Sequence, residues 1–363
     1  MAAALGLARR GLYTTHPNPR VGCVVCLDNE IIATGWHQRA GQDHAEIHAL
    51  KAAGELARGA SLYVTLEPCN HQGRTPPCVE AVIAAGITRV VVAMTDPNPQ
   101  VAGTGIQALR EAGLQVDCGL LQNQAWELNP GFISHMQRAR PWLRLKLAMS
   151  LDGRTAMANG ESRWISGEAA RADVQHWRAM SDAILTGIGT ILGDDPSLNV
   201  RTESFPQHRH YPVGEVRQPL RVILDSQVRT PVTARIFKHP GETLVIGAPG
   251  TTPKTPLPGM LEHVDHRKDG LDLNQVLASL HNRQVNEVLI EAGPRLAGAF
   301  LGAALVDEVI LYQAPVCLGQ NARPLLQLPG VQRLADKLEF EFTEVRRIGE
   351  DLRLRLIRKP SAK

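Results

Sequence analysis

One histidine and two cysteines that suit a zinc ion are the feature of this chain that most restricts its fold. His44 lies in Asp43-His44-Ala45-Glu46, and Cys69 and Cys78 follow in two Pro-Cys pairs. One imidazole and two thiolates leave the fourth position of a tetrahedral zinc ion open for water, which is typical of a catalytic site. The fold therefore has to bring these three side chains together.

The sequence around the cysteines predicts a strand–helix–strand unit over residues 61–95. Alternating and β-branched residues indicate strands at 61–66 and 89–94. Cys78 precedes a helical pattern that ends at Gly86. The loop of such a unit lies at the carboxyl end of its first strand, where ligands bind in open α/β sheets. The helix dipole would favour the thiolate form of Cys78.

A hairpin and a further helix complete the first half. Strands are expected at 21–27 and 31–35, joined by a turn at Asp28-Asn29. A helix at 105–112 leads into a strand at 114–118. These elements form an α/β/α layer.

The helix expected at 45–57 allows two interpretations of its polar residues. Asp43 takes the N-cap position, and Glu46 has the spacing of a capping box, which is a structural role. His48, one turn further on, is a rival metal ligand. The metalloprotease pattern requires Glu directly after its first His, and Ala45 occupies that place, so this reading is disfavoured.

The second half predicts a separate α/β domain that starts near residue 141. Stretches with Pro and Gly at 128–131 and 138–141 bracket the junction. Ser166 is expected to cap a helix, and Asn159-Gly160 to form a hairpin turn. Strands are expected at 142–149, 183–187, 220–225, 243–247, 287–291 and 308–313, with an antiparallel pair at 338–345 and 352–357.

A strand that runs into a helix near Gly293 is a candidate phosphate site. Residues 287–291 lead through Ala292-Gly293-Pro294 into a helix expected at 295–304. The first N–H groups of such a helix can bind a pyrophosphate, although a Gly-Pro pair is also an ordinary helix start. No GxGxxG sequence follows a strand here, so a Rossmann fold lacks its usual signature.

Composition limits the remaining classes of protein. A chain of 363 residues exceeds the usual size of one core, so two domains are expected. The formal net charge is +3, with basic and acidic residues interleaved, which argues against nucleic-acid binding. No apolar run reaches the roughly 18 to 20 residues of a membrane span, and residues 1–8 lack the charge order of a signal peptide. We expect a cytoplasmic protein that binds neither nucleic acid nor membrane.

The other four cysteines are expected to be ordinary buried thiols: Cys23, Cys26, Cys118 and Cys317. Six cysteines in so long a chain favour reduced thiols and metal ligands over a disulfide framework. Cys23 and Cys26 have metal-type spacing, but a strand would point their side chains to opposite faces.

The set His44-Ala45-Glu46, Pro68-Cys69 and Cys78 resembles the cytidine-deaminase-like zinc enzymes. The resemblance implies that zinc held by His44, Cys69 and Cys78 activates water and that Glu46 is the catalytic proton shuttle. Eight residues separate the cysteines, where the familiar motif has two. This longer loop and the stretch 16–22 are similar to the deaminase of riboflavin biosynthesis.

This resemblance implies further pocket residues in a deaminase domain over residues 1–141. By position in the motifs, the residues that would contact the base and phosphate are Asn18, His37, His71, Arg74 and Asn98. Taken alone, Asn18 and Asn98 also suit turns, and the other three suit solvated loops.

The second half is similar to the reductase of the same family, which has a dihydrofolate-reductase-like fold. Residues 145–154, 187–196 and 291–294 carry the similarity. It implies a domain over 142–363 in which NADPH delivers hydride to C1′ of a ribosyl group, giving a ribityl chain. The implied NADPH contacts are Ser150, Trp164, Ser166, Thr190, Asp194, Ser226 and Gly293. The implied substrate contacts are Lys146, Asp152, Ser162, Arg178, Arg201 and Glu291.

Both similarities together imply the bifunctional riboflavin-biosynthesis deaminase/reductase family, which acts on 2,5-diamino-6-(5-phosphoribosylamino)pyrimidin-4-one. The expected fold class is α/β, with an N-terminal cytidine-deaminase-like layer and a C-terminal dihydrofolate-reductase-like domain. The expected cofactors are Zn²⁺ and NADPH, the partners are small phosphoribosyl pyrimidines, and the assembly is a homo-oligomer. Two alternatives stay open: a nucleic-acid deaminase with a fused reductase, and a binding protein whose structural zinc takes its fourth ligand from His48 or His71.

Overall fold

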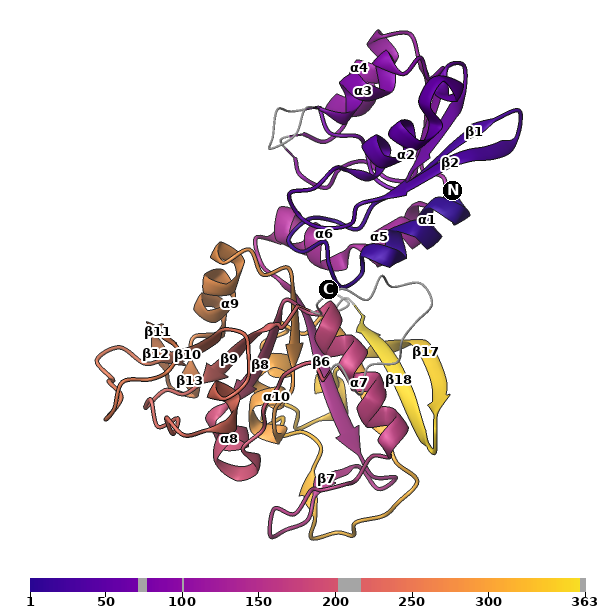
Figure 1. Cartoon of the computed structure of the whole chain (residues 1–363). Helices are drawn as coiled ribbons and strands as arrows, with labels where there is room; N and C mark the ends of the chain where they lie inside the picture. Colours follow the sequence, from indigo (N-terminus) through magenta and orange to yellow (C-terminus); the bar gives the residue numbers. More distant parts are fainter. Residues whose placement is uncertain (71–76, 100, 202–216, 360–363) are drawn as a thin grey trace. The chain divides into compact units, whose positions relative to one another are not determined.

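The structure, a computed structural model, describes residues 1–70, 77–99, 101–201 and 217–359. The chain forms two compact units, Met1–Arg140 and a second unit that begins at Pro141 (Figure 1). Each unit has a sheet and hydrophobic core clusters of its own. No helix in the described ranges is long and apolar enough to cross a membrane.

The first unit is built on a five-stranded sheet in the order β2-β1-β3-β4-β5. β3, β4 and β5 are parallel, and β1 runs antiparallel to both of its neighbours. Asp28 and Asn29 both have positive φ, as the tight turn between β1 and β2 requires. The strands are β1 Gly22–Leu27, β2 Glu30–Trp36, β3 Ser61–Val64, β4 Arg89–Val92 and β5 Gln115–Cys118.

Helices cover both faces of this sheet, which confirms the expected α/β/α layer. α2, α3 and α4 follow one another over one face, and α1 packs on the other face next to α5 (Figure 1). Their bounds are α1 Ala2–Ala8, α2 Ala45–Ala53, α3 Cys78–Ala84, α4 Thr104–Glu111, α5 Gln122–Leu128 and α6 Pro130–Arg138. α6 lies where the sequence indicated the junction between the two halves, and Pro130 takes its favourable first helical position.

The capping box expected at α2 does not form. His44, with extended φ and ψ of −74° and 166°, is the N-cap residue, so Glu46 lies one position too early for a capping box. The Asp43 carboxylate instead accepts a hydrogen bond from Lys51 at 2.6 Å. His44 therefore takes the N-cap position without a capping bond from its side chain, and Glu46 lies in the first turn of α2.

The second unit is built on a nine-stranded sheet in the order β11-β10-β9-β8-β14-β6-β15-β18-β17. The strands from β11 to β15 are parallel, and the final hairpin of β17 and β18 is antiparallel. The bounds are β6 Trp142–Met149, β8 Ala183–Gly187, β9 Leu220–Leu224, β10 Thr243–Gly247, β11 Met260–His263, β14 Glu287–Ile290, β15 Glu308–Gln313, β17 Phe340–Ile348 and β18 Asp351–Arg358. Two small pairs accompany it, β7 Arg154–Ala156 with β16 Arg323–Pro324, and β12 His266–Arg267 with β13 Gly270–Leu271.

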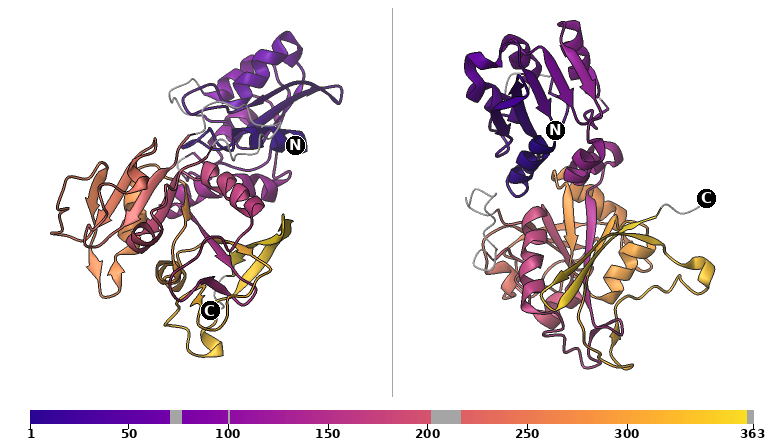
Figure 2. Two further views of the ribbon diagram at one scale, coloured as in Figure 1. Left: turned by 60° about the horizontal axis from the view of Figure 1, so that its bottom comes forward. Right: turned by 90° about the vertical axis from the view of Figure 1, so that its right-hand side faces the viewer.

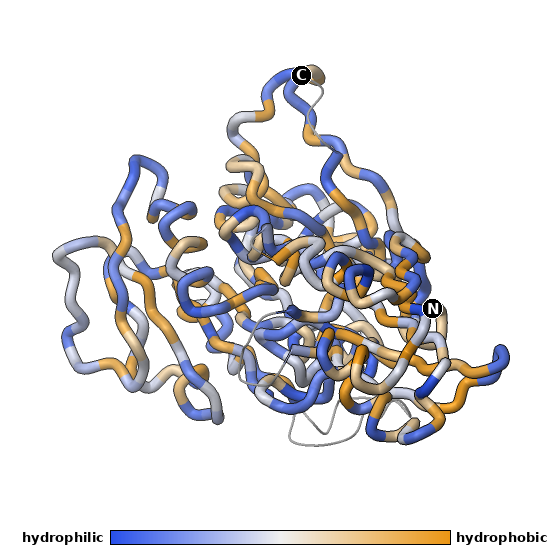
Figure 3. The backbone as a smooth tube through the Cα atoms, turned by 90° about the horizontal axis from the view of Figure 1, so that it is seen from above, coloured by the Kyte–Doolittle hydropathy of each residue, from blue (hydrophilic) through white to orange (hydrophobic). Residues whose placement is uncertain are grey.

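Helices again lie on both faces of the sheet, as the right-hand view of Figure 2 shows. α9 Leu273–Asn282 and α10 Pro294–Gly302 pack in one core cluster, and α7 Glu168–Met180 and α8 Ile188–Asp194 pack in the other. Hydrophobic and hydrophilic stretches alternate along the chain, and several outlying turns are hydrophilic (Figure 3). Because the strands from β11 to β15 are parallel, their carboxyl ends lie at one edge of the sheet.

Three local predictions in this unit and at the cysteines are wrong. Gly167, not Ser166, is the N-cap of α7, because Asp351 Oδ2 already accepts the Gly167 N–H at 2.8 Å. Asn159-Gly160 forms a turn, but β7 pairs with β16 and not across that turn. Cys118 ends the edge strand β5 and Cys317 follows β15 in a loop, so both thiols are exposed.

Gly35 fixes how closely α2 approaches the sheet. A Cβ atom at this position would lie 2.2 Å from the Ala45 carbonyl oxygen and 2.6 Å from the Ala49 nitrogen. Both contacts are with backbone, so the helix that begins at His44 would have to move. This close approach therefore holds the start of α2 against the sheet.

We expect Gly35→Ala to destabilise the first unit by about 1–3 kcal/mol, the usual cost of overpacking. Hydrogen exchange of the β1 and β2 amides, measured with increasing urea, reports this loss separately from the second unit. Gly6→Ala is the matched control, since no atom lies within 4 Å of a Cβ at that helical position. Equal stability of the two variants would contradict the packing argument.

Candidate functional site

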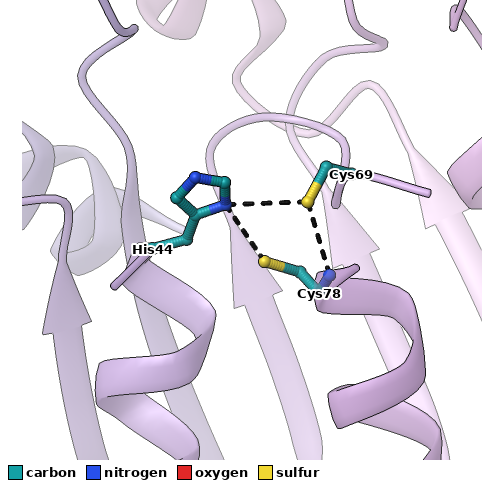
Figure 4. A group of neighbouring side chains, drawn as sticks. All are labelled: His44, Cys69 and Cys78. Carbon is teal, nitrogen blue, oxygen red and sulfur yellow. Dashed lines mark hydrogen bonds between the residues drawn. The ribbon is translucent and has the colours of Figure 1, made fainter. Parts of the chain in front are cut away.

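Three elements of the first unit bring His44, Cys69 and Cys78 together. His44 precedes α2, Cys69 follows β3, and Cys78 is the first residue of α3 (Figure 4). Their ligand atoms all lie within 4.8 Å of one another. Cys78 is buried and the other two side chains are partly exposed, so the cluster is open on one side.

The distances in this cluster fit a tetrahedral zinc ion. His44 Nδ1 lies 3.2 Å from Cys78 Sγ and 3.6 Å from Cys69 Sγ. Bond lengths of about 2.0 Å to nitrogen and 2.3 Å to sulfur at tetrahedral angles separate two such ligand atoms by about 3.5 Å. The donor set of one imidazole and two thiols is also the one that zinc prefers.

The two thiols are hydrogen-bonded to each other, which shifts their pKa values in opposite directions. The Cys69 sulfur accepts hydrogen bonds from the Cys78 thiol and from the Cys78 backbone N–H at 3.3 Å, and its pKa falls to about 4. Donating that proton, together with burial, raises the pKa of Cys78. One thiolate is therefore already stabilised at neutral pH, as a metal site requires.

Glu46 lies beside this cluster without belonging to it. Its side chain is 3% exposed and next to the Cys78 thiol. Burial raises the pKa of the Glu46 carboxyl to about 7, so it can take up and release a proton near neutral pH. Among the described residues, the cluster of possible metal ligands contains His44, Cys69 and Cys78 but neither Glu46 nor His48.

Two of the predicted pocket residues adjoin the cluster. Asn18 Nδ2 donates to His37 Nε2 at 3.1 Å, which leaves His37 Nδ1–H to donate to the Asp43 carbonyl, also at 3.1 Å. The His37 ring meets the His44 ring edge to face, with centroids 5.4 Å apart. Burial lowers the pKa of His37, in agreement with a neutral ring. Asn98 lies in the loop after β4, and His71 and Arg74 are outside the described residues.

The second unit has a large open pocket at the carboxyl ends of its parallel strands. Its volume is about 2120 Å³, and it is lined from the ends of β6, β8, β9 and β14. Eleven of the thirteen predicted reductase residues line it: Lys146, Ser162, Trp164, Ser166, Arg178, Thr190, Asp194, Arg201, Ser226, Glu291 and Gly293. Gly293 is the N-cap of α10, and a Cβ there would meet no atom within 4 Å.

Ser150 and Asp152 do not line this pocket. The Asp152 carboxylate accepts the Ser150 hydroxyl at 2.5 Å and the backbone N–H groups of Leu318 and Gly319 at 3.1 and 2.8 Å. These bonds lower the pKa of Asp152 to about 2, the Ser150 bond most of all. The pair ties the loop after β6 to the loop after β15.

An ion pair lies at the wall of the pocket. Arg178 Nε and Nη2 donate to the two carboxylate oxygens of Glu291 at 2.6 and 3.0 Å, and each side chain is 13% exposed. Burial acts to raise the pKa of Glu291, but Arg178 outweighs it and the pKa is lowered. Lys146 is close enough to both for its charge to act on them, and burial lowers its pKa.

Sequence reasoning missed several basic residues of the pocket. Arg171 lies over the exposed Trp164 ring at 4.5 Å and donates to the Ser166 carbonyl at 2.6 Å, so it fixes a segment with three predicted contacts. A second group follows the carboxyl ends of β9 and β11: Arg229, Arg235, His239, His266 and Lys268. Isolated surface cations carry no sequence pattern, and the topology of the sheet gathers these.

Both halves of the chain match described protein families. Residues 141–354 match the RibD C-terminal domain, and residues 1–94 match the cytidine and deoxycytidylate deaminase zinc-binding region. The Escherichia coli riboflavin biosynthesis protein RibD is 51% identical over 359 residues, which cover 98% of each chain. Its Haemophilus influenzae counterpart is 49% identical over 98% of this chain and 95% of its own.

Solved structures of such proteins share the fold. RibD of Acinetobacter baumannii superimposes with a TM-score of 0.89 at 46% identity, covering 99% of this chain and 98% of its own. A diaminohydroxyphosphoribosylaminopyrimidine deaminase/5-amino-6-(5-phosphoribosylamino)uracil reductase from Thermotoga maritima gives a TM-score of 0.87 at 31% identity, covering 99% and 97%. The similarity therefore extends over both units.

We expect Glu291→Gln to destabilise the second unit by about 3–5 kcal/mol at pH 7, because it leaves the Arg178 guanidinium buried without its anion. The pKa of Glu291 is lowered in the folded state, so its contribution is present above the ordinary value of 4.5 and is lost as the pH falls through the lowered value. Urea denaturation across this range should show wild type and variant converging at acid pH. Arg178→Met combined with Glu291→Gln should cost less than either change alone, and additive losses would contradict the pairing.

Proposed function

Because this chain belongs to the RibD family of riboflavin biosynthesis proteins, we propose that its two units carry out two successive reactions on one pyrimidine nucleotide. The family joins a deaminase domain to a reductase domain, and this chain has both. We assign residues 1–141 to a zinc-dependent deaminase and 142–363 to an NADPH-dependent reductase. The substrate is 2,5-diamino-6-(5-phosphoribosylamino)pyrimidin-4-one.

The observation that carries the deaminase assignment is the cluster of His44, Cys69 and Cys78 with Glu46 buried beside it. These three residues would hold zinc, which when bound supplies a water of lowered pKa and so a nucleophile at neutral pH. Glu46 takes the proton of the attacking water and passes it to the departing amine, so the ring amine leaves as ammonia and a carbonyl remains. The pKa of Glu46, about 7, suits both transfers.

The remaining deaminase residues orient the base. Asn18 and His37 form a hydrogen-bonded chain beside His44, and we assign Asn98, in the loop after β4, as a further contact to the base. Both ring nitrogens of His37 are hydrogen-bonded, and the lowered pKa keeps the ring neutral, so His37 does not compete with Glu46 for the proton of the water. We assign phosphate binding to His71 and Arg74, which lie outside the described residues.

The charge of the second pocket supports two phosphorylated ligands. Among the described residues that line it, ten are Lys or Arg and three are Asp or Glu. Three members of the second basic group, Arg229, Arg235 and Lys268, would bind the extra phosphate by which NADPH differs from NADH. The substrate lies towards Arg178, Arg201 and Glu291.

The reaction of the second pocket is the reduction of the sugar. NADPH supplies hydride to the ribosyl C1′. Lys146, whose pKa burial lowers, donates the proton that the opened sugar oxygen needs. The product carries a ribityl chain.

Glu46→Gln tests the division of labour between the units. Without a proton shuttle, the rate of ammonia release should fall by about 10²- to 10⁴-fold, while hydride transfer to the deaminated nucleotide stays at the wild-type rate. Coupled assays of ammonia and of NADPH absorbance measure both rates. Retained deamination would remove Glu46 from the reaction.

Cys78→Ser tests the metal site. The variant should be purified without zinc and without deaminase activity, because His44 and Cys69 alone do not hold the ion. Cys26→Ser is the matched control, since Cys26 is a partly buried thiol of the same unit that lies outside the cluster. Elemental analysis of both proteins gives the zinc content, and full occupancy in Cys78→Ser would overturn the ligand assignment.

A further inference from the structure

Glu67 is a buried acid that connects the segment of Cys69 to the loop between β4 and α4, which contains Asn98. It lies two residues before Cys69, its side chain is 5% exposed, and its backbone N–H donates to the carbonyl of Met94, two residues after β4. Neither the metal cluster nor the proton transfer uses it. A buried carboxylate of this kind has to be fully hydrogen-bonded.

Four backbone N–H groups satisfy this carboxylate. Oε2 accepts from Asp96 and Gly103 at 2.9 Å each, and Oε1 accepts from Gly105 and Ile106 at 2.8 and 3.1 Å. A carboxylate has about four acceptor sites, so all of them are in use. Gly103, the N-cap residue of α4, has no side chain to cap the helix, and Glu67 binds the free N–H groups in its place.

These bonds set the position of the loop between β4 and α4. Asp96 is held at its N–H by Glu67, and the Asp96 carboxylate in turn accepts the Asn98 N–H at 2.8 Å. A Cβ atom on Gly105 would lie 2.1 Å from the Pro68 carbonyl oxygen, so the start of α4 is seated directly on the Glu67-Pro68 segment. The loop therefore cannot shift without breaking bonds to Glu67.

We propose that Glu67 is a positioning residue of the deaminase, which holds the Asp96–Asn98 segment in the place from which Asn98 contacts the pyrimidine. The inference rests on the proposed function, because Asn98 is assigned there as a base contact. Glu67 itself does not touch the substrate. It acts through Asp96. Because Glu67 binds backbone N–H groups, these bonds do not depend on which side chains the loop carries.

Glu67→Gln in the full-length zinc protein tests this role. The amide nitrogen cannot accept a hydrogen bond, so about half of the four N–H groups lose their partner. We expect KM for the diaminopyrimidine nucleotide to rise about tenfold or more with a smaller change in kcat, while zinc content and the reductase rate stay at wild-type values. Glu67→Asp keeps the charge on a shorter side chain, so its KM should lie between those of the wild type and of Glu67→Gln. Glu111→Gln removes an exposed carboxylate at the other end of α4 and is the control.

A second readout needs no substrate. Hydrogen–deuterium exchange of peptides that contain Asp96 and Gly103–Ile106 should be at least about tenfold faster in Glu67→Gln than in Glu111→Gln. Unchanged exchange with unchanged KM, or loss of zinc with equal losses in kcat and in reductase rate, would overturn the positioning role. If the wild-type chain releases no ammonia, the proposed function fails, while the exchange experiment still decides whether the loop depends on Glu67.

Discussion

The carboxyl ends of parallel strands determine where both sites of this protein lie. In the first unit, the end of β3 presents Cys69 to the starts of α2 and α3, which contribute His44 and Cys78. In the second unit, β6, β8, β9 and β14 end at one pocket. Helix N-termini and loop N–H groups gather at such an edge, so anions and metal-bound thiolates are stabilised there before any particular side chain is considered.

Buried charges hold these edges in place because each has a defined partner. Glu67 binds four N–H groups in the first unit, and Arg178 binds both oxygens of Glu291 in the second. Arg144, on the central strand β6, is neutralised by Glu287 and Glu308. Lys146 lies two residues further along the same face of β6 and lines the pocket instead. A cation that faces the pocket thus lies next to one that is neutralised within the sheet.

The sequence predicted the order of strands and helices well, because hydrophobic periodicity and Gly-rich turns are local. It also indicated that His44, Cys69 and Cys78 would meet, since a strand end and two helix starts converge in a βαβ unit. One of its errors is local, since Asp43 pairs with Lys51 instead of capping α2. The others concern partners distant in sequence, as where Asp351 accepts the N–H of Gly167 at the start of α7. The role of Glu67 and the basic group around Arg229 were missed for the same reason.

The proposed function requires one chain to deaminate and then reduce the same nucleotide at two sites. The most direct test supplies purified zinc protein with the diaminopyrimidine phosphoribosyl nucleotide and NADPH, and follows ammonia and NADPH in one tube. Ammonia should appear first, and NADPH should disappear with a lag and reach the same amount. NADPH oxidation without ammonia, or ammonia release with NADPH unchanged, would contradict the account.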